Sequence, residues 1–158
     1  MNVADSQRLA SALERLGYSE SPIIEEADVI VLNTCMVRQS AEDKAIGRLS
    51  SLKPLKKKNP DLVLGVMGCM VGFKDQTEIR KKLPYVDVFA PPSNPKPIID
   101  FLILQEYIGE ASASRNVETD TVWEPGKLTL PASRRKKTVA GFIPIVYGCS
   151  HACAYCII

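Results

Sequence analysis

Apolar positions along residues 1–107 recur with the spacing of helices in some stretches and of buried strands in others. In residues 5–17, leucines share one helical face, Asp5 is expected to cap the helix and Gly17 to end it. Short apolar, β-branched runs have the pattern of strands buried on both faces. The expected strands are 28–35, 62–69 and 86–90, and the further helices are 38–52, 75–83 and 97–107. Pro54 is expected to end the helix at 38–52.

Strands that alternate with helices favour parallel pairing in an α/β sheet. The sequence therefore predicts an open sheet of the flavodoxin or Rossmann type, with helices on both faces. Such units usually open with a strand, whereas this pattern opens with a helix. We therefore expect a first strand to be missing before Met1.

The pattern changes after the last of these helices. Residues 110–138 are polar and irregular and are expected to form a linker between a domain at 1–109 and a segment at 139–158. Within that segment, GFIPIVY at 141–147 is expected to be a strand that runs directly into a cysteine-rich loop.

Charge and apolar content exclude several classes of protein. Twenty Lys and Arg against eighteen Asp and Glu give no overall bias toward nucleic acid or an acidic partner. The apolar stretch VAGFIPIVY is too short to span a bilayer, and the amino terminus lacks the features of an export signal. We expect a cytoplasmic protein without a membrane segment, in which thiols stay reduced.

Cys35 and Cys69 each stand at the end of an expected parallel strand. Since parallel strands end at one edge of the sheet, where open α/β folds bind ligands, the two thiols are expected to converge. The alternative is that each thiol only fills the core, as a free cysteine commonly does.

Three further cysteines, Cys149, Cys153 and Cys156, lie within eight residues, in the order C-x-x-x-C-x-x-C. Three thiolates in one loop can ligate three irons of a 4Fe-4S cluster and leave the fourth iron open. Zinc is the alternative, with His151 as a fourth ligand, although structural zinc sites usually use two ligand pairs set farther apart.

The loop GCSHACAYCI resembles the cluster loop of radical S-adenosylmethionine enzymes, in which an aromatic residue, here Tyr155, precedes the third cysteine. MNVADS, LNTCMVR and VMGCM stand before it in an order and spacing that resemble the methylthiotransferases. The first six residues resemble the branch that modifies tRNA, which adds a methylthio group to an isopentenylated adenosine beside the anticodon.

This resemblance implies cofactors and roles. Cys149, Cys153 and Cys156 would bind a 4Fe-4S cluster that holds S-adenosylmethionine, and Tyr155 would lie near the adenine of that cofactor or simply pack under the strand. Cys35 and Cys69 would hold a second, auxiliary 4Fe-4S cluster. The resemblance also implies a tRNA substrate, a flavodoxin- or ferredoxin-type electron donor and a monomer; it assigns no acid or base.

The chain departs from the family at both ends. Family members place a third auxiliary cysteine just before the Met-Asn pair, and a radical barrel and a small RNA-binding domain follow the cluster loop. We therefore expect this chain to be a piece of a longer enzyme and to be inactive alone. The alternatives are a non-catalytic metal-binding module, or a methylthiotransferase that acts on another tRNA nucleoside or on a ribosomal protein.

Two basic runs, KPLKKK at 53–58 and RRKK at 134–137, could contact phosphates. The alternative is that each is a solvated charged surface. No aromatic residues alternate with the basic ones, so neither run indicates stacking on bases.

We predict that anaerobic reconstitution with iron and sulfide loads mainly the C-terminal loop, because only there are three thiols close in sequence. Cys149→Ala should abolish this loading, measured as iron bound per chain. Unchanged iron content after replacement of all three cysteines of the loop would show that this interpretation is wrong.

Overall fold

A computed structural model describes residues 2–35, 39–73 and 76–108. The helices are α1 (Asn2–Arg15), α2 (Gln39–Lys58), α3 (Cys69–Phe73), α4 (Gln76–Lys82) and α5 (Lys96–Ile108), with a short 3-10 turn at Ile24–Glu26. The strands are β1 (Val29–Thr34), β2 (Val63–Gly68) and β3 (Val88–Ala90). The expected strand at 141–147, the linker and the cluster loop lie outside the described residues.

The three strands form one parallel sheet in the order β1-β2-β3. In β1 and β2, Val29 is the partner of Val63 and Thr34 the partner of Gly68, so the two strands are in register along their whole length. The central strand is buried at every position. The expected α/β class and parallel sheet are thereby confirmed.

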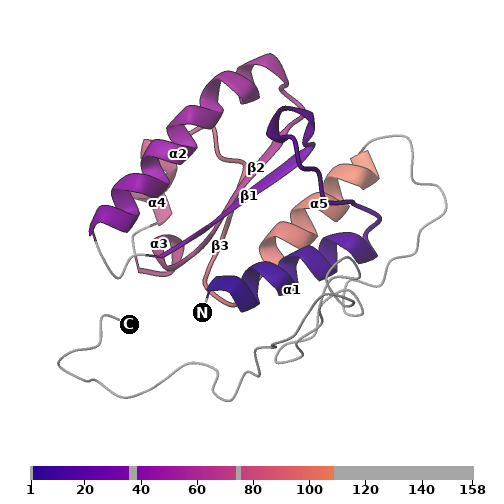
Figure 1. Ribbon diagram of the computed structural model, residues 1–158, viewed down its shortest axis with the longest axis horizontal. Helices are drawn as coiled ribbons and strands as arrows, with labels where there is room; N and C mark the ends of the chain where they lie inside the picture. The colour runs from indigo at the N-terminus through magenta and orange to yellow at the C-terminus, as the bar shows by residue number, and fades with distance from the viewer. Residues whose placement is uncertain (1, 36–38, 74–75, 109–158) are drawn as a thin grey trace.

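One face of the sheet is covered by α2, α3 and α4 (Figure 1). Val66 of β2 and Phe89 of β3 pack there against Leu49 of α2 and Ile79 of α4. The connections from β1 to β2 and from β2 to β3 therefore both cross the same face of the sheet.

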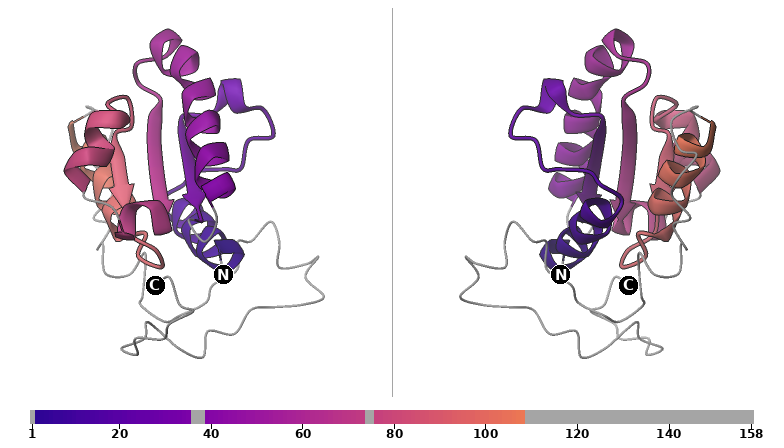
Figure 2. Two further views of the ribbon diagram at one scale, coloured as in Figure 1. Left: turned by 90° about the vertical axis from the view of Figure 1, so that its left-hand side faces the viewer. Right: turned by 90° about the vertical axis from the view of Figure 1, so that its right-hand side faces the viewer.

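The other face of the sheet is covered by α1 and α5, as the two opposite views of Figure 2 show. Its core joins Leu9 of α1 and Met67 and Val88 of the strands to Ile98 and Leu102 of α5. Neighbouring residues of β2 thus contribute to opposite cores, which is why this strand reads as a continuous apolar run.

Two expectations about helix ends are wrong. The first helix begins at Asn2 and not after Asp5. Asp5 lies within the first turn, where it pairs with Arg8 (3.3 Å between Oδ1 and Nη1) and accepts a hydrogen bond from Ser93 (3.1 Å). Asp5 therefore contacts one local partner, Arg8, and one distant partner, Ser93, from a position inside the helix.

Pro54 does not end α2, which continues to Lys58. A proline inside a helix removes one hydrogen bond and costs about 3 kcal/mol. Pro54 lies on the exposed side of the helix, and the residues after it are held by tertiary contacts. Leu55 packs against an apolar cluster around Leu62, and Lys56 forms an ion pair.

That ion pair ties the end of α2 to the start of the sheet. Nζ of Lys56 lies 2.9 Å from Oδ2 of Asp87, and the same carboxylate oxygen accepts a hydrogen bond from the backbone N–H of Leu64 at 2.8 Å. Nζ also donates to the carbonyl of Pro60 at 3.1 Å. Asp87 therefore contacts both α2, through Lys56, and the central strand, through the Leu64 backbone.

We predict that Asp87→Asn lowers the free energy of unfolding by about 1–3 kcal/mol, because it removes a charge-assisted partner from two part-buried donors. Urea denaturation measures the change. Asp100→Asn is the matched control, since the Asp100–Lys96 pair is about half exposed and should contribute less than about 1 kcal/mol. Equal losses in the two variants would contradict the role assigned to Asp87.

Candidate metal centre

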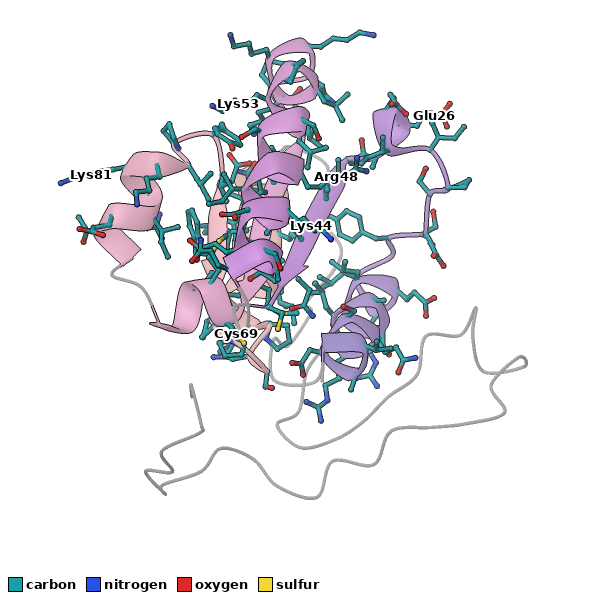
Figure 3. The ribbon with its side chains drawn as sticks, turned by 60° about the vertical axis from the view of Figure 1, so that its left-hand side comes forward. Glu26, Lys44, Arg48, Lys53, Cys69 and Lys81 are labelled. Carbon is teal, nitrogen blue, oxygen red and sulfur yellow. The ribbon has the colours of Figure 1, made fainter. Side chains whose placement is uncertain are left out.

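Cys35 and Cys69 lie at the carboxyl ends of neighbouring parallel strands. Thr34 and Gly68 are partners in the sheet, and Cys35 and Cys69 are the residues that directly follow them. The spacing of strands and of successive Cα atoms therefore puts the Cα atoms of the two cysteines at most about 13 Å apart. Figure 3 labels Cys69 at this end of the sheet, beside α3. The expected placement of both residues at the end of neighbouring strands is confirmed, whereas the convergence of their thiols and their role as metal ligands stay predictions.

Both thiols are unbridged, and they differ in exposure. Cys35 is half-buried, and Cys69 is 9% exposed. Thiolates are the ligands that iron–sulfur clusters prefer, and two of them at one sheet edge suit two ligand positions of a cubane. Within the described ranges, no group of three metal-binding side chains occurs. Further ligands would therefore have to come from elsewhere.

The turn that carries Cys69 requires glycine at position 68. Gly68 has a φ of 105°, a conformation that side chains rarely adopt. A Cβ atom there would also collide with the carbonyl oxygen of Thr34 and lie 2.8 Å from Oδ1 of Asn33. This close approach brings the backbone before Cys69 against the backbone before Cys35.

The sequence prediction extended the strand through Cys69, whereas β2 ends at Gly68 and Cys69 opens α3. A Gly-Cys pair after an apolar run was the available signal for this change of direction. The sequence analysis did not identify Thr34 as a residue of this site. Its side chain is 2% exposed, and its hydroxyl donates a hydrogen bond to the Met67 carbonyl of β2.

Polar side chains surround the same edge of the sheet. Asn33 donates from Nδ2 to Oγ of Ser6 at 3.0 Å, which fixes the start of α1 to the end of β1. The buried Arg8–Asp5 pair lies in the same first turns of α1. These contacts hold α1 close to the cysteines and line the edge with hydrogen-bonding groups.

A groove of about 790 Å³ lies along α1, the loop after it and β1, and neither cysteine lines it. Ser6 and Asn33 mark one end, and Tyr18, Glu20 and Asp28 are among its other lining residues. The groove and the cysteine pair are therefore different features.

The basic run at 53–58 lies toward the end of α2, away from Cys69 (Figure 3). Lys53 lies over the ring of Tyr85, 4.7 Å from its centroid, and Lys56 pairs with Asp87. Lys53 and Lys56 thus have partners within the protein, an arrangement that neither alternative foresaw, and phosphate contact by the run stays a prediction. The second run, 134–137, lies outside the described residues.

The residues expected to bind the radical cluster are also outside the part of the chain that the structure describes. These are Cys149, Cys153, Cys156 and Tyr155, together with His151 of the zinc alternative. No helix within residues 2–35, 39–73 and 76–108 is long and apolar enough to cross a membrane.

A family model described as "Uncharacterized protein family UPF0004" matches residues 1–91, which contain both strand-end cysteines. The chain belongs to the UPF0004 family.

Individual relatives of this UPF0004 chain carry a functional name. The tRNA-2-methylthio-N(6)-dimethylallyladenosine synthase of Clostridium novyi (strain NT) is 39% identical over 162 residues, covering 100% of the chain and 34% of the relative. The enzymes of the same name from Clostridium perfringens (strain SM101 / Type A) and Herpetosiphon aurantiacus are 40% and 38% identical, again over 100% of the chain and 34% and 33% of the relatives.

The resemblance to the tRNA-modifying methylthiotransferases, expected from short motifs, is confirmed by these matches. The UPF0004 chain spans about a third of the length of these relatives. What the remaining two thirds of the relatives contribute is therefore not represented in it.

We predict that Gly68→Ala destabilises this UPF0004 chain by at least about 2 kcal/mol, because alanine meets both an unfavourable φ and a backbone carbonyl. Urea denaturation gives the measurement. Gly47→Ala is the matched control: it faces open space within α2 and should stabilise by about 0.5–1 kcal/mol. A Gly68→Ala variant as stable as the parent would show that the turn is not constrained.

Proposed function

We propose that this chain forms part of a tRNA methylthiotransferase that adds a methylthio group to C2 of N6-isopentenyladenosine beside the anticodon. The observation that carries the proposal is identity of 37–40% with tRNA-2-methylthio-N(6)-dimethylallyladenosine synthases over the whole chain. The paired strand-end cysteines support it, because they offer thiolates at the edge where open α/β sheets bind ligands.

In this proposal the thiols divide into two ligand sets. Cys149, Cys153 and Cys156 bind the 4Fe-4S cluster that holds S-adenosylmethionine, with Tyr155 near the adenine. Cys35 and Cys69 provide two of the ligands of an auxiliary 4Fe-4S cluster, whose third thiolate lies outside this chain. When bound, these groups supply the radical and sulfur-transfer chemistry that side chains cannot perform.

The chain's own task is then to hold thiolates at fixed positions in a site with limited access to water. Cys69 is nearly buried, and the Gly68 turn sets its backbone against β1. The proposal divides the chain into an auxiliary-cluster domain at 1–109, a linker at 110–138 and the start of a radical domain at 139–158. The intact enzyme would be a cytoplasmic monomer that receives electrons from a flavodoxin- or ferredoxin-type donor.

A non-catalytic metal-binding module is the second candidate. The observation behind it is that Cys35 and Cys69 both follow paired strands, a placement that bears on metal binding and not on catalysis. Metal identity separates the two functions: a brown, oxygen-sensitive iron cluster supports the enzyme, whereas colourless zinc supports the module.

We predict that this chain can replace the matching 162 residues of the Clostridium novyi relative without loss of methylthio transfer to tRNA. The measurement is mass spectrometry of nucleosides from tRNA that lacks the modification, after anaerobic incubation with the swapped enzyme, S-adenosylmethionine and a strong reductant. The control is the same swapped enzyme with Cys69→Ser, which should form no methylthio nucleoside. A swapped enzyme that binds both clusters and yet forms none, while its parent does, would contradict the proposal.

The 158-residue chain alone is expected to form no methylthio nucleoside in the same assay. These 158 residues span about a third of the length of the relatives. The resemblance implies that walls of a barrel outside this third hold S-adenosylmethionine and exclude water from the radical. Catalytic formation of the product by this chain would show that those missing parts are not required.

A further inference from the structure

The hydroxyl of Thr34 bridges two backbone groups on either side of Cys69. Oγ1 donates a hydrogen bond to the carbonyl of Met67 at 2.9 Å and accepts one from the N–H of Met70 at 3.4 Å. Thr34 is 2% exposed, so water does not compete for these contacts. The backbone on both sides of Cys69 is therefore held by the side chain that precedes Cys35.

Both of these backbone groups lie where regular structure changes. The first N–H groups of a helix have no partner within the helix, and Met70 is the second residue of α3. Met67 lies one residue before the end of β2. The Thr34 hydroxyl thus spans the junction between β2 and α3, which contains Gly68 and Cys69.

Both hydrogen bonds need a hydroxyl at position 34, and a side chain of the same size without one cannot make them. Valine has nearly the same shape as threonine, but it can neither donate to Met67 nor accept from Met70. Serine keeps both functions and loses only a methyl group. The two substitutions therefore separate the hydrogen bonds from the packing.

We infer that Thr34 is a positioning residue that fixes Cys69 relative to Cys35, so that both thiols can bind one metal centre. The inference rests on the proposed function for the metal centre itself. The hydrogen bonds of Thr34 are independent of it, because they connect groups of this chain alone.

The test uses the full chain with Cys149, Cys153 and Cys156 replaced by serine, so that only Cys35 and Cys69 remain. The probe is Cd²⁺, a thiolate-seeking ion, and thiolate-to-cadmium absorption measures its affinity. In this background Thr34→Val should weaken Cd²⁺ binding about tenfold, and Thr34→Ser should stay within about twofold of the parent.

Asp87→Asn is the control for stability, because it weakens the sheet at the end opposite to the cysteines. It should leave Cd²⁺ affinity unchanged at temperatures where the chain is folded. If Thr34→Val binds Cd²⁺ as tightly as the parent, Thr34 does not position the thiols, and the proposed metal centre is unaffected. If the parent does not bind Cd²⁺ through both thiolates, the shared metal centre fails and the positioning role fails with it.

A second measurement needs no metal, and its first part needs only the parent chain. In the parent chain, hydrogen exchange by NMR should show the amide of Met70 protected, because Thr34 accepts its proton in a buried site. In Thr34→Val the same amide should exchange at least about tenfold faster, while the Leu64 amide next to Asp87 should not change. A Met70 amide that exchanges freely in the parent would overturn the inference even where Thr34→Val does not fold.

Discussion

Parallel pairing of β1 with β2 is the constraint on which the rest of the described structure depends. Residues 34 positions apart in the sequence are partners along the whole pair, from Val29 and Val63 to Thr34 and Gly68. A shift by one residue would exchange the two faces of β2, so that Val66 and Met67 would each enter the core that the other now fills. In the same register, Cys35 and Cys69 are the residues that directly follow the last pair, Thr34 and Gly68.

The elements that could be predicted are those encoded by nearby residues. The apolar run of β2 is visible because the strand is buried on both sides, and the leucines of α1 are visible because they share one face. The role of Asp5 and the continuation of α2 past Pro54 were predicted wrongly. In each case the structure shows a contact with a residue distant in the sequence, from Ser93 to Asp5 and from Lys56 to Asp87, which a local pattern does not reveal.

The candidate site shows the same division. The position of Cys35 and Cys69 follows from a general property of parallel sheets and could be predicted from the strands alone. The contributions of Gly68 and Thr34 could not be predicted. The close approach of Gly68 to the Thr34 carbonyl, and the hydrogen bond from the Thr34 hydroxyl to Met67, exist only once the two strands are paired. The loop with Cys149, Cys153 and Cys156 is known from its sequence pattern and its family resemblance alone.

The long sequence separation between the two paired strands links folding to metal chemistry. In an unfolded chain, Cys35 and Cys69 are the ends of a long loop and rarely meet, since closing such a loop costs conformational entropy. In the folded chain, the pairing of β1 with β2 already holds the two cysteines near each other, so an ion that binds both does not have to close this loop. By thermodynamic linkage, an ion bound through both thiols would add its binding free energy to the stability of the β1–β2 pair. Loss of the ion would then lower the stability of the sheet, and the unfolding transition of the domain would depend on the concentration of free metal.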